Sequence, residues 1–188
     1  MPLYLTETEV AELLAPAPMI EAVERCFQRL ARGEIDNRPR VRQKADGGAF
    51  ATMSAVDREL RLAGVKSYAW VQAGTPFVVC LFDLDGGALA AVIEADKLGQ
   101  LRTGAASAVA AKYLAREGAT TLGVIGCGWQ AESQILSMRE VLTSVERVVV
   151  YCRNEENLQR FCERLGCEPA ETHREAGEQD VVVTVTTS

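Results

Sequence analysis

The fold of this chain is decided by one stretch, Thr121-Leu122-Gly123-Val124-Ile125-Gly126-Cys127-Gly128-Trp129-Gln130-Ala131. It predicts an apolar strand, a glycine turn and the start of a helix. Gly126 permits the tight turn, Gly128 lets backbone N–H groups approach a pyrophosphate, and Ala131 is small enough for helix–strand packing. The phosphates would lie at the helix N-terminus, where free N–H groups favour an anion. The pattern therefore predicts a dinucleotide-binding Rossmann unit. The alternative is a glycine turn in a flavodoxin-like sheet without a dinucleotide.

The segment after this turn alternates between helix and strand. We expect helices over 129–142 and 155–165, and strands over 121–125, 147–151 and 181–186. Continuous Val-rich strands are typical of a parallel sheet that is buried on both faces. The last strand is apolar on both faces, and its backbone N–H and C=O groups would be unpaired along one edge. We therefore expect an incomplete sheet and a chain that is a fragment.

The residues before the turn have a different pattern. An Ala-rich helix is predicted over 105–115, and Arg102 and Thr103 at its expected start would form a second anion site. Upstream, a capping box at Thr6–Glu9 opens the first of two helices, and strands follow, which is an α+β pattern. We therefore predict an N-terminal α+β substrate-binding and dimerisation domain over 1–115, and the first half of a Rossmann domain over 116–188. The expected elements are helices 10–14 and 20–30 and strands 50–53, 62–71, 77–84 and 88–93.

The end of the second Rossmann strand bears on the choice of cofactor. An acidic residue there binds the ribose 2′-hydroxyl of NAD, whereas a nearby Arg accepts the 2′-phosphate of NADP. This chain has Tyr151-Cys152-Arg153-Asn154 at that place, with no carboxylate. The residues favour NADP(H) and leave NAD(H) possible. The alternative is that Arg153 is a solvated loop charge.

Composition excludes several classes of partner and site. The net charge is −6, so the surface does not attract nucleic acid or anionic lipid in bulk. No apolar run approaches the roughly 20 residues of a membrane helix. The six cysteines form no C-x-x-C pair and His173 is the single histidine, so we expect no metal site. We expect reduced thiols and a cytoplasmic protein.

Two longer motifs resemble a known family. Gln100–Ala115 is similar to the signature helix of the ornithine cyclodeaminase and mu-crystallin family, and Gly123–Ala131 resembles that family's glycine loop. The resemblance runs from about Arg38 to Ser188. It implies hydride transfer at the carbon between an amine or imine and a carboxylate. Shorter matches, in the same order and at approximately the family's spacing, are Pro39-Arg40-Val41, Met53 and Gly64-Val65-Lys66.

The resemblance also implies roles for single residues. Arg40, Lys66 and Arg102 would hold the substrate carboxylate, and Lys66 would assist proton transfer as the catalytic residue. Some residues are expected to line the cofactor by resemblance alone. They add to the site residues already predicted in the glycine loop and at the end of the second strand. The predicted cofactor site is Arg102, Thr103, Gly126, Gly128, Trp129, Gln130, Ala131, Arg153, Asn154 and Thr186.

As to function, the resemblance implies an NAD(P)-dependent oxidoreductase that reduces a cyclic ketimine or pyrroline-2-carboxylate, with a small amino or imino acid as substrate. Two alternatives stay open: an ornithine cyclodeaminase, and a non-catalytic NADPH-dependent ligand-binding protein of mu-crystallin type. Cys152 stands where cyclodeaminases carry an Asp, and Phe77 replaces a usual Thr. The family's catalytic Asp has no counterpart here, so we expect the 188-residue form to lack turnover.

The resemblance implies a homodimer as well, because the family's N-terminal strands build one. In this chain, the predicted strands carry more apolar surface than two helices would cover. The alternative is that these residues pack under the helix at 19–32. The side chains concerned are Trp70, Phe77, Val78, Val79, Leu81 and Phe82.

Overall fold

The computed structural model describes residues 1–72 and 74–186. Ala73 of the predicted linker 72–76 lies outside the described residues, as do Thr187 and Ser188 after the last predicted strand. The chain forms two compact units, the first from Met1–Leu14 and Glu24–Gly99 and the second from Ala15–Val23 and Gln100–Ser188. The last passage between the units falls at Gly99–Gln100. The domain boundary predicted at residue 115 stays a prediction.

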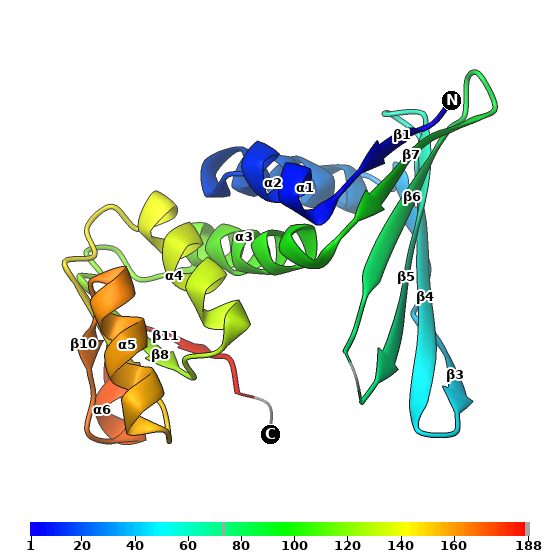
Figure 1. The fold of residues 1–188 in the computed structure, drawn as a ribbon. Helices are drawn as coiled ribbons and strands as arrows, with labels where there is room; N and C mark the ends of the chain where they lie inside the picture. The colour runs from blue at the N-terminus through cyan, green and yellow to red at the C-terminus, as the bar shows by residue number, and fades with distance from the viewer. Residues whose placement is uncertain (73, 187–188) are drawn as a thin grey trace. The chain divides into compact units, whose positions relative to one another are not determined.

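The first unit is built on a seven-stranded sheet (Figure 1). Its order is β1-β7-β6-β5-β4-β2, with β3 paired to β4. Neighbours are antiparallel, except that β1 is parallel to β7. The four predicted strands are confirmed, β5 with the predicted bounds and β4 longer than expected. The strands are β1 Leu3–Leu5, β2 Ile35–Asn37, β3 Val41–Ala45, β4 Gly48–Asp57, β5 Leu62–Val71, β6 Phe77–Asp83 and β7 Ala88–Glu94.

Three strands of this sheet, β1, β2 and β3, have no signal in the sequence. All residues of β3 are exposed, so no alternation of apolar and polar side chains marks it. It is held by backbone pairing with β4 along its whole length. Strand β1 pairs with β7, with Leu3 opposite Ala91, and a partner so distant in the chain leaves no local pattern.

Two helices precede most of the sheet. Helix α1 spans Glu7–Leu13, and the predicted capping box is confirmed: the Thr6 hydroxyl accepts from the Glu9 N–H while the Glu9 carboxylate accepts from the Thr6 N–H. Helix α2 spans Pro16–Ala31. Pro16 is the first residue of α2, a position where a helix tolerates proline.

Helix α3 spans Asp96–Leu114, so it begins well before the Ala-rich segment. The prediction that Arg102 and Thr103 open this helix is wrong, since both lie within it. The true start is capped from far away in the chain: the Glu7 carboxylate accepts the backbone N–H groups of Asp96, at 3.0 Å, and of Lys97, at 2.5 Å. Such a cap has no signature in the sequence around the helix.

The second unit carries the predicted parallel sheet, a four-stranded one in the order β10-β9-β8-β11 (Figure 1). In chain order the strands run 3-2-1-4, the start of the doubly wound arrangement. The core between the sheet and its helices includes fully buried Leu122, Val124, Ile135 and Val150. The elements are β8 Thr121–Ile125, α4 Trp129–Val141, β9 Arg147–Tyr151, α5 Glu155–Leu165, β10 Glu168–Pro169, α6 His173–Gly177 and β11 Val181–Thr184.

Strand β11 pairs with β8 on the side away from β9, so the strand order reverses at β8. A carboxylate fixes this pairing at its start: Asp180 accepts the N–H groups of Thr120, at 2.7 Å, and Thr121, at 3.1 Å, and pairs with Arg116. The Thr120 N–H and the neighbouring donors lower the pKa of Asp180 to about 2. In doubly wound sheets the crevice at such a reversal is where ligands bind.

Candidate functional site

The glycine loop between β8 and α4 has the geometry that a dinucleotide needs. Gly126 has a φ of 117°, and a Cβ there would lie 2.7 Å from the Val185 carbonyl oxygen. Gly128 is the N-cap of α4 and makes no side-chain cap hydrogen bond. Apart from its two chain neighbours, no described residue has a heavy atom within 4 Å of the place where a Gly128 Cβ would stand. The backbone at Gly128, where α4 begins, is therefore open to a ligand that approaches it.

A cavity of about 540 Å³ lies beside this loop, at the reversal of strand order. It is lined by the end of β8, the glycine loop, the end of β9 and the residues after β11. Five of the ten predicted cofactor residues line it, whereas Ala131 is fully buried beneath the loop. The roles of Trp129 and Gln130 stay predictions. The lining residues are Ile125, Gly126, Gly128, Tyr151, Cys152, Arg153, Asn154, Val185 and Thr186.

Helix α3 fixes the start of α4 from within the second unit. The fully buried Gln100 side chain donates to the Trp129 carbonyl at 2.5 Å. A Cβ on Gly104 would lie 2.3 Å from the Ser133 carbonyl oxygen, so the helices approach too closely for any larger residue. Gln100 has no place among the predicted site residues. Its signal in the sequence is its place at the start of Gln100–Ala115, the stretch that resembles the family's signature helix.

The reduced-thiol expectation is wrong for two of the six cysteines. Cys127 of the glycine loop and Cys152 after β9 form a disulfide, with 5.7 Å between their Cα atoms. The reason is the parallel register, because Ile125 lies opposite Tyr151 and the chain continues from both strands side by side. The pairing spans 25 residues and has no motif. The other four cysteines, Cys26, Cys80, Cys162 and Cys167, are free as expected.

Two polar residues follow the end of β9. Arg153 is exposed and lines the cavity, and no described residue forms a hydrogen bond or ion pair with its guanidinium. The Asn154 Oδ1 accepts the Asn157 N–H at 2.8 Å, which makes Asn154 the N-cap of α5. The Arg153 side chain is thus available to an anion in the cavity, while that of Asn154 has a structural partner.

The first unit gathers the two predicted carboxylate ligands that belong to it. The Lys66 Nζ lies 4.5 Å from the centre of the Phe77 ring and 5.8 Å from that of Tyr68. The Arg40 guanidinium carbon lies 5.8 Å from the same Tyr68 ring. The two rings are 4.9 Å apart. Arg102 belongs to the second unit, so its place in this group stays a prediction.

The aromatic rings beside these cations are only partly visible in the sequence. Tyr68 follows Lys66 at the two-residue spacing that puts both on one face of β5.

Burial raises the pKa of Asp96, the Glu7 carboxylate raises it further, and Lys66 opposes the change. The region therefore combines cations, an aromatic wall and a partly desolvated acid, which suits a small anion with an apolar body.

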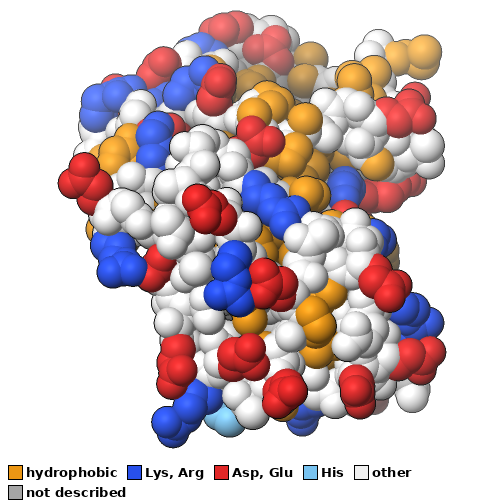
Figure 2. All heavy atoms as spheres, turned by 90° about the vertical axis from the view of Figure 1, so that its left-hand side faces the viewer, with side chains coloured by type: hydrophobic (Ala, Val, Ile, Leu, Met, Phe, Trp, Pro, Cys, Tyr) orange, Lys and Arg blue, Asp and Glu red, His pale blue; other side chains and the backbone are white. Residues whose placement is uncertain are grey.

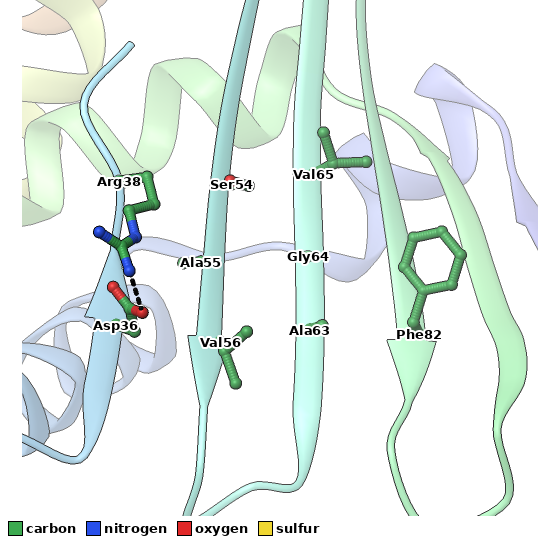
Figure 3. Close-up of a pocket in the computed structure, with 9 residues that line it drawn as sticks. All are labelled: Asp36, Arg38, Ser54, Ala55, Val56, Ala63, Gly64, Val65 and Phe82. Atoms are coloured by element: carbon green, nitrogen blue, oxygen red, sulfur yellow. Dashed lines mark hydrogen bonds and ion pairs between the residues drawn. The ribbon is translucent and has the colours of Figure 1, made fainter.

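The other face of the seven-stranded sheet bears a shallow cavity of about 310 Å³ (Figure 3). Figure 3 shows Val56, Val65 and Phe82 around it, with Asp36 and Arg38 paired at its edge. Strand alternation puts Val65 opposite to Lys66. The centre of this cavity is therefore apolar, the Asp36–Arg38 pair lies at its edge, and the cavity is separate from the cationic group.

Charged side chains of both signs share one face of the molecule. Figure 2 shows acidic and basic side chains interspersed over the face that it presents. Across residues 1–72 and 74–186, no group of three or more His, Cys, Asp or Glu side chains has the arrangement of a metal site. Within the same residues, no helix is long and apolar enough to cross a membrane.

The chain matches the ornithine cyclodeaminase/mu-crystallin family over residues 2–188. It is 35% identical over 203 residues to an alanine dehydrogenase of Archaeoglobus fulgidus, in an alignment that covers 99% of this chain and 60% of that protein. An archaeal alanine dehydrogenase dimer with bound NAD has a similar structure, with a TM-score of 0.92 and 32% identity over 100% of this chain and 61% of the other.

A third similar protein is the delta(1)-pyrroline-2-carboxylate reductase of Thermococcus litoralis, solved in complex with NADH and L-proline. It has a TM-score of 0.89 and 30% identity, over 99% of this chain and 62% of the other. The chain therefore spans between 60% and 62% of the length of these relatives.

Proposed function

The chain belongs to the ornithine cyclodeaminase/mu-crystallin family, and we propose that its protein uses NADPH to reduce a cyclic ketimine or pyrroline-2-carboxylate at the carbon that bears the carboxylate. The observation that carries the proposal is the cavity at the glycine loop, onto which the uncapped N-terminus of α4 opens. A pyrophosphate fits there because Gly128 leaves the backbone bare. The similar archaeal alanine dehydrogenase contains NAD, and the similar pyrroline-2-carboxylate reductase contains NADH.

The residues that would hold the dinucleotide come from the loop and the ends of two strands. The backbone of Gly126 and Gly128 would bind the pyrophosphate, with Trp129 and Gln130 beside it and Ala131 allowing the close packing. Thr186 lies in the cavity after β11, near the proposed place of the nicotinamide. We also assign Arg102 and Thr103 to this group, on the resemblance of their helix to the family.

We propose NADP(H) over NAD(H) because of the end of β9. Cys152 is bonded to Cys127 and offers no acceptor to a ribose hydroxyl. Arg153 lines the cavity without a partner among the described residues. A guanidinium in that position binds a 2′-phosphate by charge-assisted hydrogen bonds. NAD(H), which the similar structures contain, is the alternative cofactor.

For the substrate, we propose that Arg40 and Lys66 bind the carboxylate together with Arg102. Neutralising this charge fixes the orientation of the reacting carbon, which is catalysis by positioning and electrostatics. The nicotinamide, when bound, supplies the hydride. Lys66 would deliver a proton to the imine nitrogen as the hydride reaches the carbon, so that an amine results. The Tyr68 and Phe77 rings beside Lys66 favour an apolar substrate ring.

A substrate panel tests this function. Pyrroline-2-carboxylate and cyclic ketimines with NADPH are compared with ornithine and NAD, using the complete protein. We expect turnover of the imines and its loss in Lys66→Met, with NADPH binding retained. Lys44→Met, on the exposed strand β3, is the matched control and keeps activity. Turnover of ornithine alone would make the protein a cyclodeaminase, and NADPH binding without any turnover would favour a ligand-binding protein.

We further propose a homodimer that forms through the apolar face shown in Figure 3. Phe50 and Phe82 lie on this face, with 42% and 41% of their surfaces exposed. The apolar side chains predicted to form the interface divide between the faces, with Val78 and Phe82 on this one and the rest on the Lys66 side. Light scattering should give a dimer for the native protein and a monomer for Val65→Glu. Leu60→Glu, in an exposed turn, is the control.

A cytoplasmic location is also proposed. Four of the six cysteines are free, and unpaired thiols persist in a reducing compartment. A disulfide in such a compartment is usually transient, and it has a catalytic or redox-sensing role. Fractionation of cells that produce the complete protein, with compartment markers, tests this location.

A further inference from the structure

One covalent bond in the second unit has no part in the proposed reaction. The Cys127–Cys152 disulfide joins the glycine loop to the end of β9, and Cys152 lines the cavity of the proposed cofactor site. Both cysteines are half-buried and pack against the core of the unit. The bond thus connects two segments that a dinucleotide would contact.

The backbone holds the two cysteines at bonding distance independently of the sulfur atoms. Ile125 is the last β8 residue in register with β9, opposite Tyr151. The next residue, Gly126, donates its N–H to the Tyr151 carbonyl at 2.8 Å. The Cα atoms of the cysteines are then 5.7 Å apart, within the usual range for a disulfide. The bond can therefore form and break while the sheet stays intact.

The remaining cysteines of the second unit do not compete for this chemistry. Burial raises the pKa of the Cys162 thiol to about 11 and also raises that of Cys167. The reactive species in thiol exchange is the thiolate, so these two thiols are poor nucleophiles at neutral pH. Cys26 and Cys80 belong to the first unit and are free.

We propose that Cys127 and Cys152 form a reversible redox site that fixes the glycine loop to the end of β9. Its reaction partner is a small disulfide in the oxidising direction and a thiol in the reducing one. One cysteine thiolate attacks the small disulfide and releases one thiol, which leaves a mixed disulfide. The second cysteine thiolate then displaces the other thiol. Two protein thiols are oxidised, one small disulfide becomes two thiols, and the two protons end on those thiols.

The consequence for ligand binding rests on the proposed function. In the bonded form the loop already has the conformation that lines the cavity. In the reduced form the loop gains freedom, which binding must remove. Fixing the backbone of one residue before binding corresponds to about five- to thirtyfold in affinity. The disulfide removes only part of the backbone freedom of the loop. We therefore expect about three- to tenfold tighter NADPH binding in the oxidised form.

Peptide mapping tests the bond itself and needs no cofactor. The complete protein is equilibrated with oxidised glutathione, unfolded, alkylated and digested without reduction. We expect a Cys127–Cys152 crosslinked peptide that disappears after treatment with reduced glutathione. Amide exchange at 126–128 should be slower in the oxidised form. Alkylation of all six cysteines after oxidation, or equal exchange in the two forms, overturns the proposal.

Calorimetry with NADPH tests the coupling. The ratio of the dissociation constants should be about three to ten in the native protein and in Cys26→Ser, and one in Cys127→Ser. By linkage, bound NADPH should shift the thiol–disulfide equilibrium by the same factor. A ratio of one in the native protein overturns the coupling. If neither form binds NADPH, the proposed function fails, and the mapping and amide exchange still decide the redox site.

Discussion

Replacement of Arg153 by Ala tests how this protein distinguishes its cofactors. The side chain is exposed, lines the cavity, and has no described partner, so its removal exposes no buried group and breaks no internal bond. A hydrogen bond to a charged group contributes about 1.5–3 kcal/mol. This range corresponds to about ten- to hundredfold in affinity. NADPH should weaken by this factor and NADH should hardly change.

The assay is fluorescence titration of each cofactor against native protein and Arg153→Ala. Arg160→Ala is the matched control, since Arg160 is an exposed arginine of α5 that contacts Glu156 and Asn157. It removes the same charge from a residue that does not line the cavity. The NADPH affinity of native protein should also fall more steeply with salt than that of Arg153→Ala. Equal weakening of both cofactors would refute the reasoning, because Arg153 would then support the loop and not recognise the phosphate.

Three further predictions concern the support of the site. Gly126→Ala places a side chain at a φ of 117°, so it should destabilise the protein by about 1–3 kcal/mol in urea unfolding. The same variant should lose cofactor binding in a titration, and native-like binding would contradict this prediction. Gly104→Ala brings a Cβ to 2.3 Å from the Ser133 carbonyl oxygen and should cost about 1–3 kcal/mol of unfolding free energy, whereas an unchanged urea midpoint would exclude the close contact. The folded-state pKa of Asp180, about 2, lies below its unfolded value, so its contribution is present above pH 4 and is lost as pH falls toward 2. The stability difference between native protein and Asp180→Asn should therefore narrow over that pH range, and a constant difference would show that the carboxylate is not the cause.

The sequence by itself determined the elements whose pattern is local. Strand β8, the glycine loop and α4 follow from a strand period, two glycines and a small residue within eleven positions. Strands β5 and β9 and helix α5 also have the predicted bounds. The candidate cofactor loop could be recognised for the same reason, since a close approach of backbone to phosphate requires particular residue types at fixed spacing.

Tertiary structure alone decided the features that join distant parts of the chain. Glu7 caps α3, which moves the helix start from the predicted Arg102 to Asp96. The all-exposed strand β3 exists because β4 offers a paired edge. Cys127 and Cys152 meet because two parallel strands end side by side. In each case the stabilising partner is remote in sequence, and its contribution depends on distance in space, which no local spacing of residue types encodes.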